Sequence, residues 1–139
     1  MRLFADSSAL AKRYIPEPGR DIVLARCAAA DEVIISFLAP IEVVSAFNRL
    51  RRAGRLSDEQ YDELKLKLTT DVQHATVVQP GPALVPTAFA CLERAPLRAS
   101  DAIHVASALQ CNPDLFLSGD HRQCVAARAM GLNVEEITP

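Results

Sequence analysis

The sequence has no large charge excess and no long apolar run, and we expect no leader segment. Its net charge of −2 excludes a general polyanion-binding protein, so any contact with nucleic acid needs a local basic patch. No apolar run reaches the length of a membrane span. No apolar segment follows a charged leader, because Met1 and Arg2 run directly into a candidate strand. We therefore expect a cytoplasmic protein without a membrane segment.

Paired cysteines are absent as well. The four cysteines are widely spaced, without a C-x-x-C pair and without histidines at zinc-finger spacing. We interpret them as small buried apolar residues rather than zinc ligands or disulfide partners. The cysteines are Cys27, Cys91, Cys111 and Cys124.

Apolar β-like runs alternate with helical patterns along the chain, which has no linker, repeat or low-complexity segment. At 139 residues, half of them apolar, we expect a single domain over 1–139. The alternation predicts an α/β fold with a mostly parallel sheet covered on both faces. The predicted strands are 2–6, 32–37, 75–79, 114–118 and 133–137. The predicted helices are 8–15, 20–30, 41–53, 57–70, 86–94, 101–111 and 121–130.

Polar and proline residues mark several helix starts. Pro40 precedes the third helix, and Ser57 with Gln60 has the spacing of a capping box. Ser100 is the predicted N-cap of the helix that Asp101 opens. We begin the fifth helix at Pro86, because proline is poorly tolerated inside a helix.

Four carboxylates follow strands or open helices in this scheme. Strand ends and helix starts share one edge of a parallel α/β layer, which is the edge where open α/β folds bind ligands. Four acids gathered there would repel one another unless a cation neutralised them, and oxygen ligands favour Mg²⁺ or Mn²⁺. The helix starts would also help to keep Glu42 and Asp101 ionised. The acids are Asp6, Glu42, Asp101 and Asp120.

Three of the acids also have a simpler interpretation. Asp6 could be only an N-cap, Glu42 could only complement a helix dipole, and Asp120 could be a turn residue. Asp101 precedes an apolar helix, where an unpaired carboxylate is costly. The agreement of all four on one edge favours the metal site.

Several motifs closely resemble the PIN domain of VapC-type toxins, in the order of that family and over almost the whole chain. The most specific of them surrounds Asp101. The motifs are Asp6-Ser7-Ser8-Ala9-Leu10, Tyr14 with Glu17-Pro18-Gly19, Glu42 opening an apolar helix, Arg98-Ala99-Ser100-Asp101-Ala102-Ile103-His104-Val105-Ala106, and Leu117-Ser118-Gly119-Asp120 followed by Gly131.

This resemblance implies a three-layer α/β/α PIN-like domain that acts as a metal-dependent endoribonuclease on structured RNA such as tRNA or rRNA. It also implies a toxin role beside a small antitoxin protein, and a homodimer. The acidic positions of the family fall on the four acids above. Its small hydroxyl residues fall on Ser7 and on Ser118, where threonine is more usual.

We hypothesise that three aspartates hold one or two Mg²⁺ or Mn²⁺ ions: Asp6, Asp101 and Asp120. Glu42 would join this cage or orient the attacking water. Arg98 and Arg122, near the acidic edge, are the candidates for contact with substrate phosphate.

Two other groups receive simpler interpretations. The basic cluster of Arg49, Arg51, Arg52 and Arg55 is interpreted as a solvated helix end rather than an RNA contact. His104 is interpreted as a structural histidine on an apolar helix rather than a general base.

Three other classes of protein fit the sequence less well. A non-catalytic PIN-like binding module is the main alternative, and the presence of all four acids argues against it. An aspartyl-phosphate phosphatase would need a second acid where Ser8 stands. A receiver domain would need a late lysine, and the last lysine is Lys67.

Overall fold

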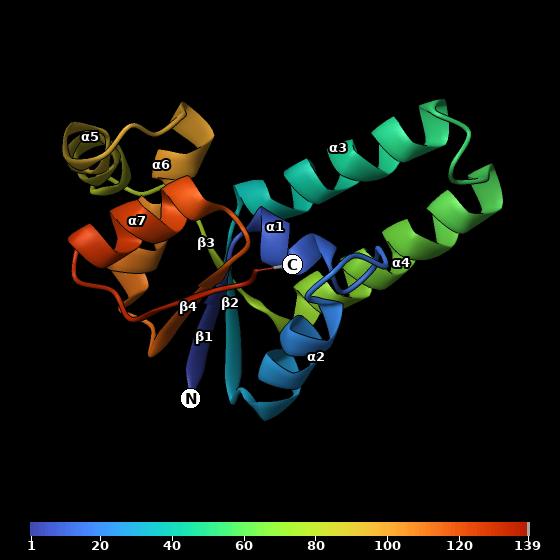
Figure 1. Ribbon diagram of the computed structural model, residues 1–139, viewed down its shortest axis with the longest axis horizontal. Helices are drawn as coiled ribbons and strands as arrows, with labels where there is room; N and C mark the ends of the chain where they lie inside the picture. Colours follow the sequence, from blue (N-terminus) through green and yellow to red (C-terminus); the bar gives the residue numbers. More distant parts are fainter. Residues whose placement is uncertain (139) are drawn as a thin grey trace.

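A sheet of five parallel strands forms the centre of the computed structural model, which describes residues 1–138 (Figure 1). The strand order is β3-β2-β1-β4-β5, and every neighbouring pair is parallel. The prediction of a mostly parallel sheet is therefore confirmed. The strands are β1 Arg2–Ala5, β2 Glu32–Ser36, β3 Thr76–Val78, β4 Leu115–Ser118 and β5 Val134–Glu136.

Helices cover both faces of this sheet and make three layers. The helices α1 to α4 pack on one face, and α5 to α7 pack on the other (Figure 1). The first group is α1 Ser7–Ala11, α2 Arg20–Ala29, α3 Leu38–Arg52 and α4 Asp58–His74. The second group is α5 Leu84–Arg94, α6 Ala99–Cys111 and α7 His121–Ala129.

Alternate residues of the central strand β1 supply the two cores, because successive side chains of a strand point to opposite faces. Leu3 and Ala5 belong to the core under α1 to α4. Phe4 belongs to the other core, where its ring stacks on Phe116 with the centroids 5.5 Å apart. Both faces of β1 are therefore apolar, as is usual for a parallel strand covered on both sides.

Three predicted helix starts were two or three residues too late. Helix α3 begins at Leu38 rather than 41, α5 at Leu84 rather than 86, and α6 at Ala99 rather than 101. Pro40 and Pro86 each stand third in their helix, where a backbone N–H has no helical acceptor and its loss costs little. Glu42 therefore lies in the second turn of α3 and does not open it.

The predicted N-cap at Ser100 was also wrong. Arg98 is the N-cap of α6, and the carboxylate of Asp101 accepts a hydrogen bond of 3.0 Å from the Arg98 backbone N–H. Asp101 is thus the third residue of the helix and acts as the acidic half of a capping box. From this third position the carboxylate of Asp101 reaches the Arg98 backbone N–H. The helix therefore begins at Ala99, and Ser100 lies inside it.

Two other helices differ in length. Helix α1 ends at Ala11 rather than 15, because residues 12–14 form tighter turns with bonds such as Lys12 N–H to the Ala9 carbonyl at 3.1 Å. Helix α4 extends to His74, four residues past the predicted end. Neither change moves a predicted site residue.

The structure of residues 1–138 bears on the expectations about a membrane segment and about the cysteines. No helix there is long and apolar enough to cross a bilayer. The four cysteines are free, with Cys91 and Cys124 buried and the other two partly buried.

Candidate active site

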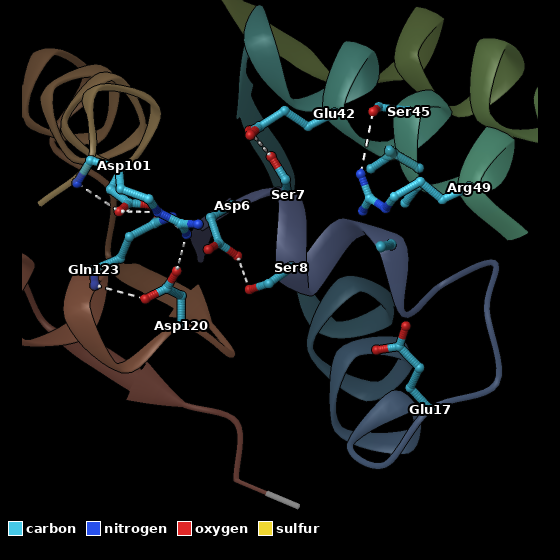
Figure 2. Close-up of a pocket in the computed structure, with 14 residues that line it drawn as sticks. Asp6, Ser7, Ser8, Glu17, Glu42, Ser45, Arg49, Asp101, Asp120 and Gln123 are labelled. Atoms are coloured by element: carbon cyan, nitrogen blue, oxygen red, sulfur yellow. Dashed lines mark hydrogen bonds and ion pairs between the residues drawn. The ribbon is translucent and has the colours of Figure 1, made fainter.

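The four predicted acids line one cavity of about 450 Å³ (Figure 2). Asp6 directly follows β1, and Asp120 lies just beyond the neighbouring strand β4. Asp101 comes from the first turn of α6 and Glu42 from the second turn of α3. The cavity therefore lies at the carboxyl edge of the sheet, where the central strand β1 and its neighbour β4 end.

Asp6 is the innermost acid and has no exposed surface. Its Oδ1 caps α1 by accepting the Ala9 backbone N–H at 2.9 Å and also accepts the Ser8 hydroxyl at 2.7 Å. Its Oδ2 accepts the Ser118 hydroxyl at 2.6 Å. Burial raises the pKa of Asp6 above its ordinary value, although the bonds from Ser118, Ala9 and Ser8 oppose that rise.

Asp101 is also buried, but it has a cation beside it. The guanidinium of Arg98 contacts the carboxylate with Nε at 3.2 Å, and the Gln123 amide donates to Oδ1 at 3.1 Å. Burial alone would raise the pKa of Asp101, but the bonds from Arg98 and Gln123 together lower it below its ordinary value.

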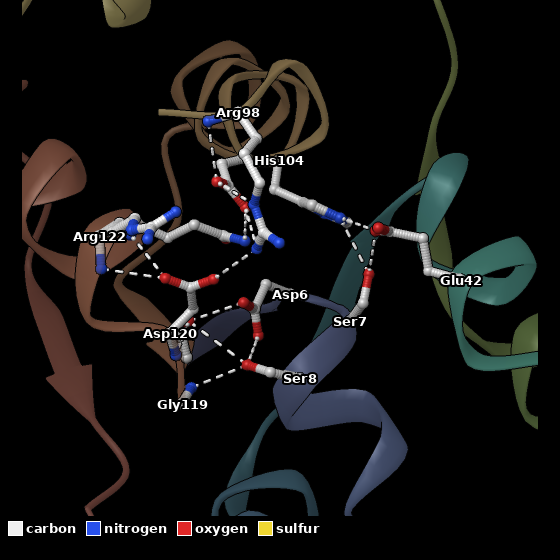
Figure 3. A network of polar contacts seen from close by, with 12 residues as sticks. Asp6, Ser7, Ser8, Glu42, Arg98, His104, Gly119, Asp120 and Arg122 are labelled. Carbon is white, nitrogen blue, oxygen red and sulfur yellow. Dashed lines mark hydrogen bonds and ion pairs between the residues drawn. The ribbon is translucent and has the colours of Figure 1, made fainter. Parts of the chain in front are cut away.

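Asp120 is the N-cap of α7. Its Oδ1 accepts the backbone N–H groups of Arg122 at 2.9 Å and Gln123 at 3.3 Å, and its own backbone N–H donates to the Ser118 hydroxyl at 2.9 Å. The hydroxyl of Ser118 therefore connects Asp120 to Asp6. The second oxygen of Asp120 faces Arg98, so this arginine bridges two acids (Figure 3).

Glu42 is held by residues from two other helices. The buried His104 contacts Glu42 Oε1 through Nε2, and the Ser7 hydroxyl donates to the same oxygen at 2.5 Å (Figure 3). The bond from His104 is the main reason that the pKa of Glu42 is lowered. The helix dipole does not explain this shift, because its effect is confined to the first turn and Glu42 lies beyond it.

The histidine, predicted to be structural, is buried and also belongs to the polar network. Only 1% of its surface is exposed, and its Nε2 lies 2.9 Å from the Ser7 hydroxyl. His104 thus positions an acid without reaching the cavity itself. No signal in the sequence indicates this role, because the contact joins α6 to α3.

Two cavity residues that contact the aspartates were missed in the sequence. Ser8 lines the cavity, donates to Asp6 and accepts the Gly119 backbone N–H at 2.9 Å. Gln123 lines the cavity beside Asp101. The serine follows Asp6 in the motif and could have been found there, whereas Gln123 has no spacing that distinguishes it from other polar residues of α7.

The two arginines predicted to contact substrate differ in position. Arg98 lines the cavity, whereas Arg122 is exposed and is not part of the cavity wall. The contact of Arg122 with Asp120 is through its backbone N–H. A substrate contact for the Arg122 side chain stays a prediction.

The donor atoms of the cavity fit a hydrated divalent ion better than a dry cage. Within residues 1–138, no group of three or more histidine, cysteine or acidic residues is arranged to hold a metal directly. Mg²⁺ usually keeps several waters and binds through one or two carboxylates. The carboxylates of Asp6, Asp101 and Asp120 on one cavity wall are the oxygen donors that suit an ion bound in this way.

A family model described as PIN domain matches residues 3–129 of the sequence. The chain belongs to the PIN domain family. This membership agrees with the three-layer fold and confirms the resemblance found in the motifs. No curated protein matches the sequence.

Solved structures with the same fold cover nearly the whole PIN domain chain. VapC20 of Mycobacterium tuberculosis, a toxin described as cleaving the sarcin–ricin loop, has 18% identity and a TM-score of 0.69, with 99% of each chain covered. A toxin–antitoxin complex from Klebsiella pneumoniae has 13% identity and a TM-score of 0.70, covering 99% of this chain and 98% of that one. FitAcB from Neisseria gonorrhoeae has 14% identity and a TM-score of 0.71, with 95% of each chain covered.

Proposed function

We propose that this PIN domain is a metal-dependent endoribonuclease and the toxin of a toxin–antitoxin pair. The observation that carries the proposal is the convergence of four acids from separate segments on one cavity. Buried and partly buried acids gathered in a cavity are costly unless they serve a site. The toxins among the structures of similar fold support the biological role.

The three aspartates would hold Mg²⁺ or Mn²⁺, in part through water. A divalent ion bound there lowers the pKa of its water and stabilises negative charge on a phosphodiester. The chain supplies the orientation: the Ser8 and Ser118 hydroxyls fix the carboxylate of Asp6 from both of its oxygens. The aspartates are Asp6, Asp101 and Asp120.

Glu42 would orient the attacking water. Its Oε1 is occupied by His104 and Ser7, whereas its Oε2 makes no hydrogen bond within residues 1–138. The lowered pKa keeps Glu42 ionised at neutral pH, so that Oε2 can accept a hydrogen bond from the water. Arg98, at the cavity wall, would contact the phosphate once its two acids have another cation.

The proposed substrate is structured RNA, such as tRNA or ribosomal RNA, and the proposed partner is a small antitoxin. VapC20, described as cleaving the sarcin–ricin loop, supports ribosomal RNA as one possibility. The toxin–antitoxin complex of similar fold supports the partner. A homodimer stays a prediction from the family resemblance.

The test is to incubate the purified protein with total cellular RNA and to map new ends by sequencing. The reactions contain Mg²⁺, Mn²⁺ or EDTA, and Asp6→Ala is run in parallel with circular dichroism as a check of folding. We expect discrete cuts that need metal and disappear in the variant. No cuts from folded, partner-free protein under either metal would favour the non-catalytic binding module instead.

A further inference from the structure

The cavity continues away from the four acids along one face of α3 (Figure 2). Glu42, Ser45 and Arg49 of this helix all line it. These positions lie on one helix face, because residues three, four and seven apart are neighbours on the same side. At 1.5 Å per residue, Arg49 stands about 10 Å along the helix axis from Glu42.

Arg49 differs from Arg98 and Lys12, two cations near the cavity that are neutralised within the chain. Arg98 pairs with Asp101 and Asp120. Lys12 pairs at 2.9 Å with Glu17, the remaining acid of the cavity wall. Arg49 makes one side-chain bond within residues 1–138, from Nη1 to the Ser45 hydroxyl at 3.4 Å, and forms no ion pair there.

The structure also separates Arg49 from the basic cluster seen in the sequence. Arg51 lies over the Tyr61 ring, 4.3 Å from its centroid, and donates to Asn48 at 2.8 Å. Arg52 is exposed and does not line the cavity. The Arg52 side chain thus fits the interpretation as part of a solvated helix end. The Arg49 side chain instead faces the cavity beside the acids.

We propose that Arg49, together with the Ser45 hydroxyl, binds an RNA phosphate next to the phosphodiester at the acids. This subsite rests on the proposed nuclease function and sets the direction in which the strand crosses the cavity. A cavity walled by acids repels a polyanion, so the strand needs a cation at the other end. The arginine fork suits two oxygens of one phosphate, and the serine hydroxyl adds another donor.

The test measures binding of a short 2′-O-methyl oligouridylate, which resists cleavage, by fluorescence anisotropy over a range of KCl concentrations. Arg49→Gln is compared with Arg52→Gln, which removes the same charge three residues further along α3. We expect Kd to rise about ten-fold in Arg49→Gln, as for loss of one charged hydrogen-bonded contact. The salt slope, which is the slope of log Kd against the logarithm of the KCl concentration, should decrease by the amount expected for the loss of about one phosphate contact. Arg52→Gln should match the wild type in both.

Further variants and probes separate the outcomes. Arg49→Lys keeps the charge without the fork and should restore the salt slope but only part of the affinity. Equal Kd and equal salt slope in Arg49→Gln and the wild type would overturn the subsite. The subsite would also be overturned if Arg49→Gln lost as much affinity for polyglutamate as for the oligonucleotide. The contact would then favour an acidic protein segment.

The subsite and the nuclease function can fail separately. If the wild type cuts RNA and Arg49→Gln binds the oligonucleotide unchanged, only the subsite is wrong. If the folded wild type neither binds nor cuts RNA, both are wrong.

Discussion

Arg98 and Asp120 face each other across the cavity, with Nη2 of the arginine 3.4 Å from Oδ2 of the aspartate. The same guanidinium contacts Asp101 at 3.2 Å. A cation of the chain itself therefore stands between two of the proposed metal ligands. An ion that binds these carboxylates must compete with it.

Arg98→Gln should therefore increase the affinity for Mn²⁺. The arginine is largely exposed, so its ion pairs are weakened by solvent and the expected gain is only about a few-fold. Isothermal titration with Mn²⁺ measures the change. Arg122→Gln is the matched control, because its side chain lies outside the cavity wall. An unchanged Kd for Mn²⁺ in Arg98→Gln would show that the arginine does not compete.

Asp6→Asn should abolish cleavage and yet stabilise the protein in EDTA. Burial raises the pKa of Asp6, so the ionised carboxylate costs folding free energy at neutral pH. This cost disappears as the pH falls below the ordinary pKa of aspartate, where the side chain is protonated in both states. Thermal unfolding should thus show a Tm gain of a few degrees at neutral pH that shrinks in acid. A variant that is less stable at neutral pH would contradict this account of Asp6.

His104→Leu should raise the pKa of Glu42 toward its ordinary value. The bond from His104 favours the ionised carboxylate, and leucine cannot donate one. The stability that Glu42 contributes above its unfolded pKa, and loses as the pH falls through its lowered folded pKa, should also decrease. A carboxyl ¹³C NMR titration of Glu42 measures the shift. His104→Gln retains a donor and should preserve more of it, and equal titrations in both variants would argue against the histidine as the cause.

Ser118→Ala should destabilise the protein by about 1–3 kcal/mol, because it leaves a buried carboxylate oxygen without its donor. The lost hydroxyl bonds both Asp6 and the Asp120 backbone. Urea unfolding at neutral pH checks the value. Ser118→Thr keeps the hydroxyl and should lose less stability. A loss of the same size in both variants would point to packing rather than to the hydrogen bond.

The layered fold could be predicted from the sequence, because apolar strand runs such as that containing Phe4 alternate with amphipathic helices. Helix starts were harder to predict. Proline is tolerated both just before a helix and within its first turn. Pro40 and Pro86 alone therefore do not fix the residue at which each helix begins. The prediction of Ser100 as an N-cap was wrong because the capping contact of α6 comes from Asp101. This acid is the third residue of a helix whose N-cap is Arg98.

Within the candidate site, the acids could be predicted because parallel topology assigns strand ends and helix starts to one edge. The supporting contacts could not. The link from His104 to Glu42 joins α6 to α3, and the link from Gln123 to Asp101 joins α7 to α6. Such pairs depend on how helices pack, which sequence spacing does not specify. The roles of the four acids stay predictions until they are measured.

The four acids are proposed to act together on a bound divalent ion. Electron paramagnetic resonance of free Mn²⁺ during titration of the wild type and Asp101→Asn, with RNA cleavage measured on the same samples, tests this proposal. We expect the wild type to bind Mn²⁺ and to cut, and the folded variant to lose at least ten-fold in Mn²⁺ affinity together with cleavage. Equal Mn²⁺ binding by both proteins would contradict the account.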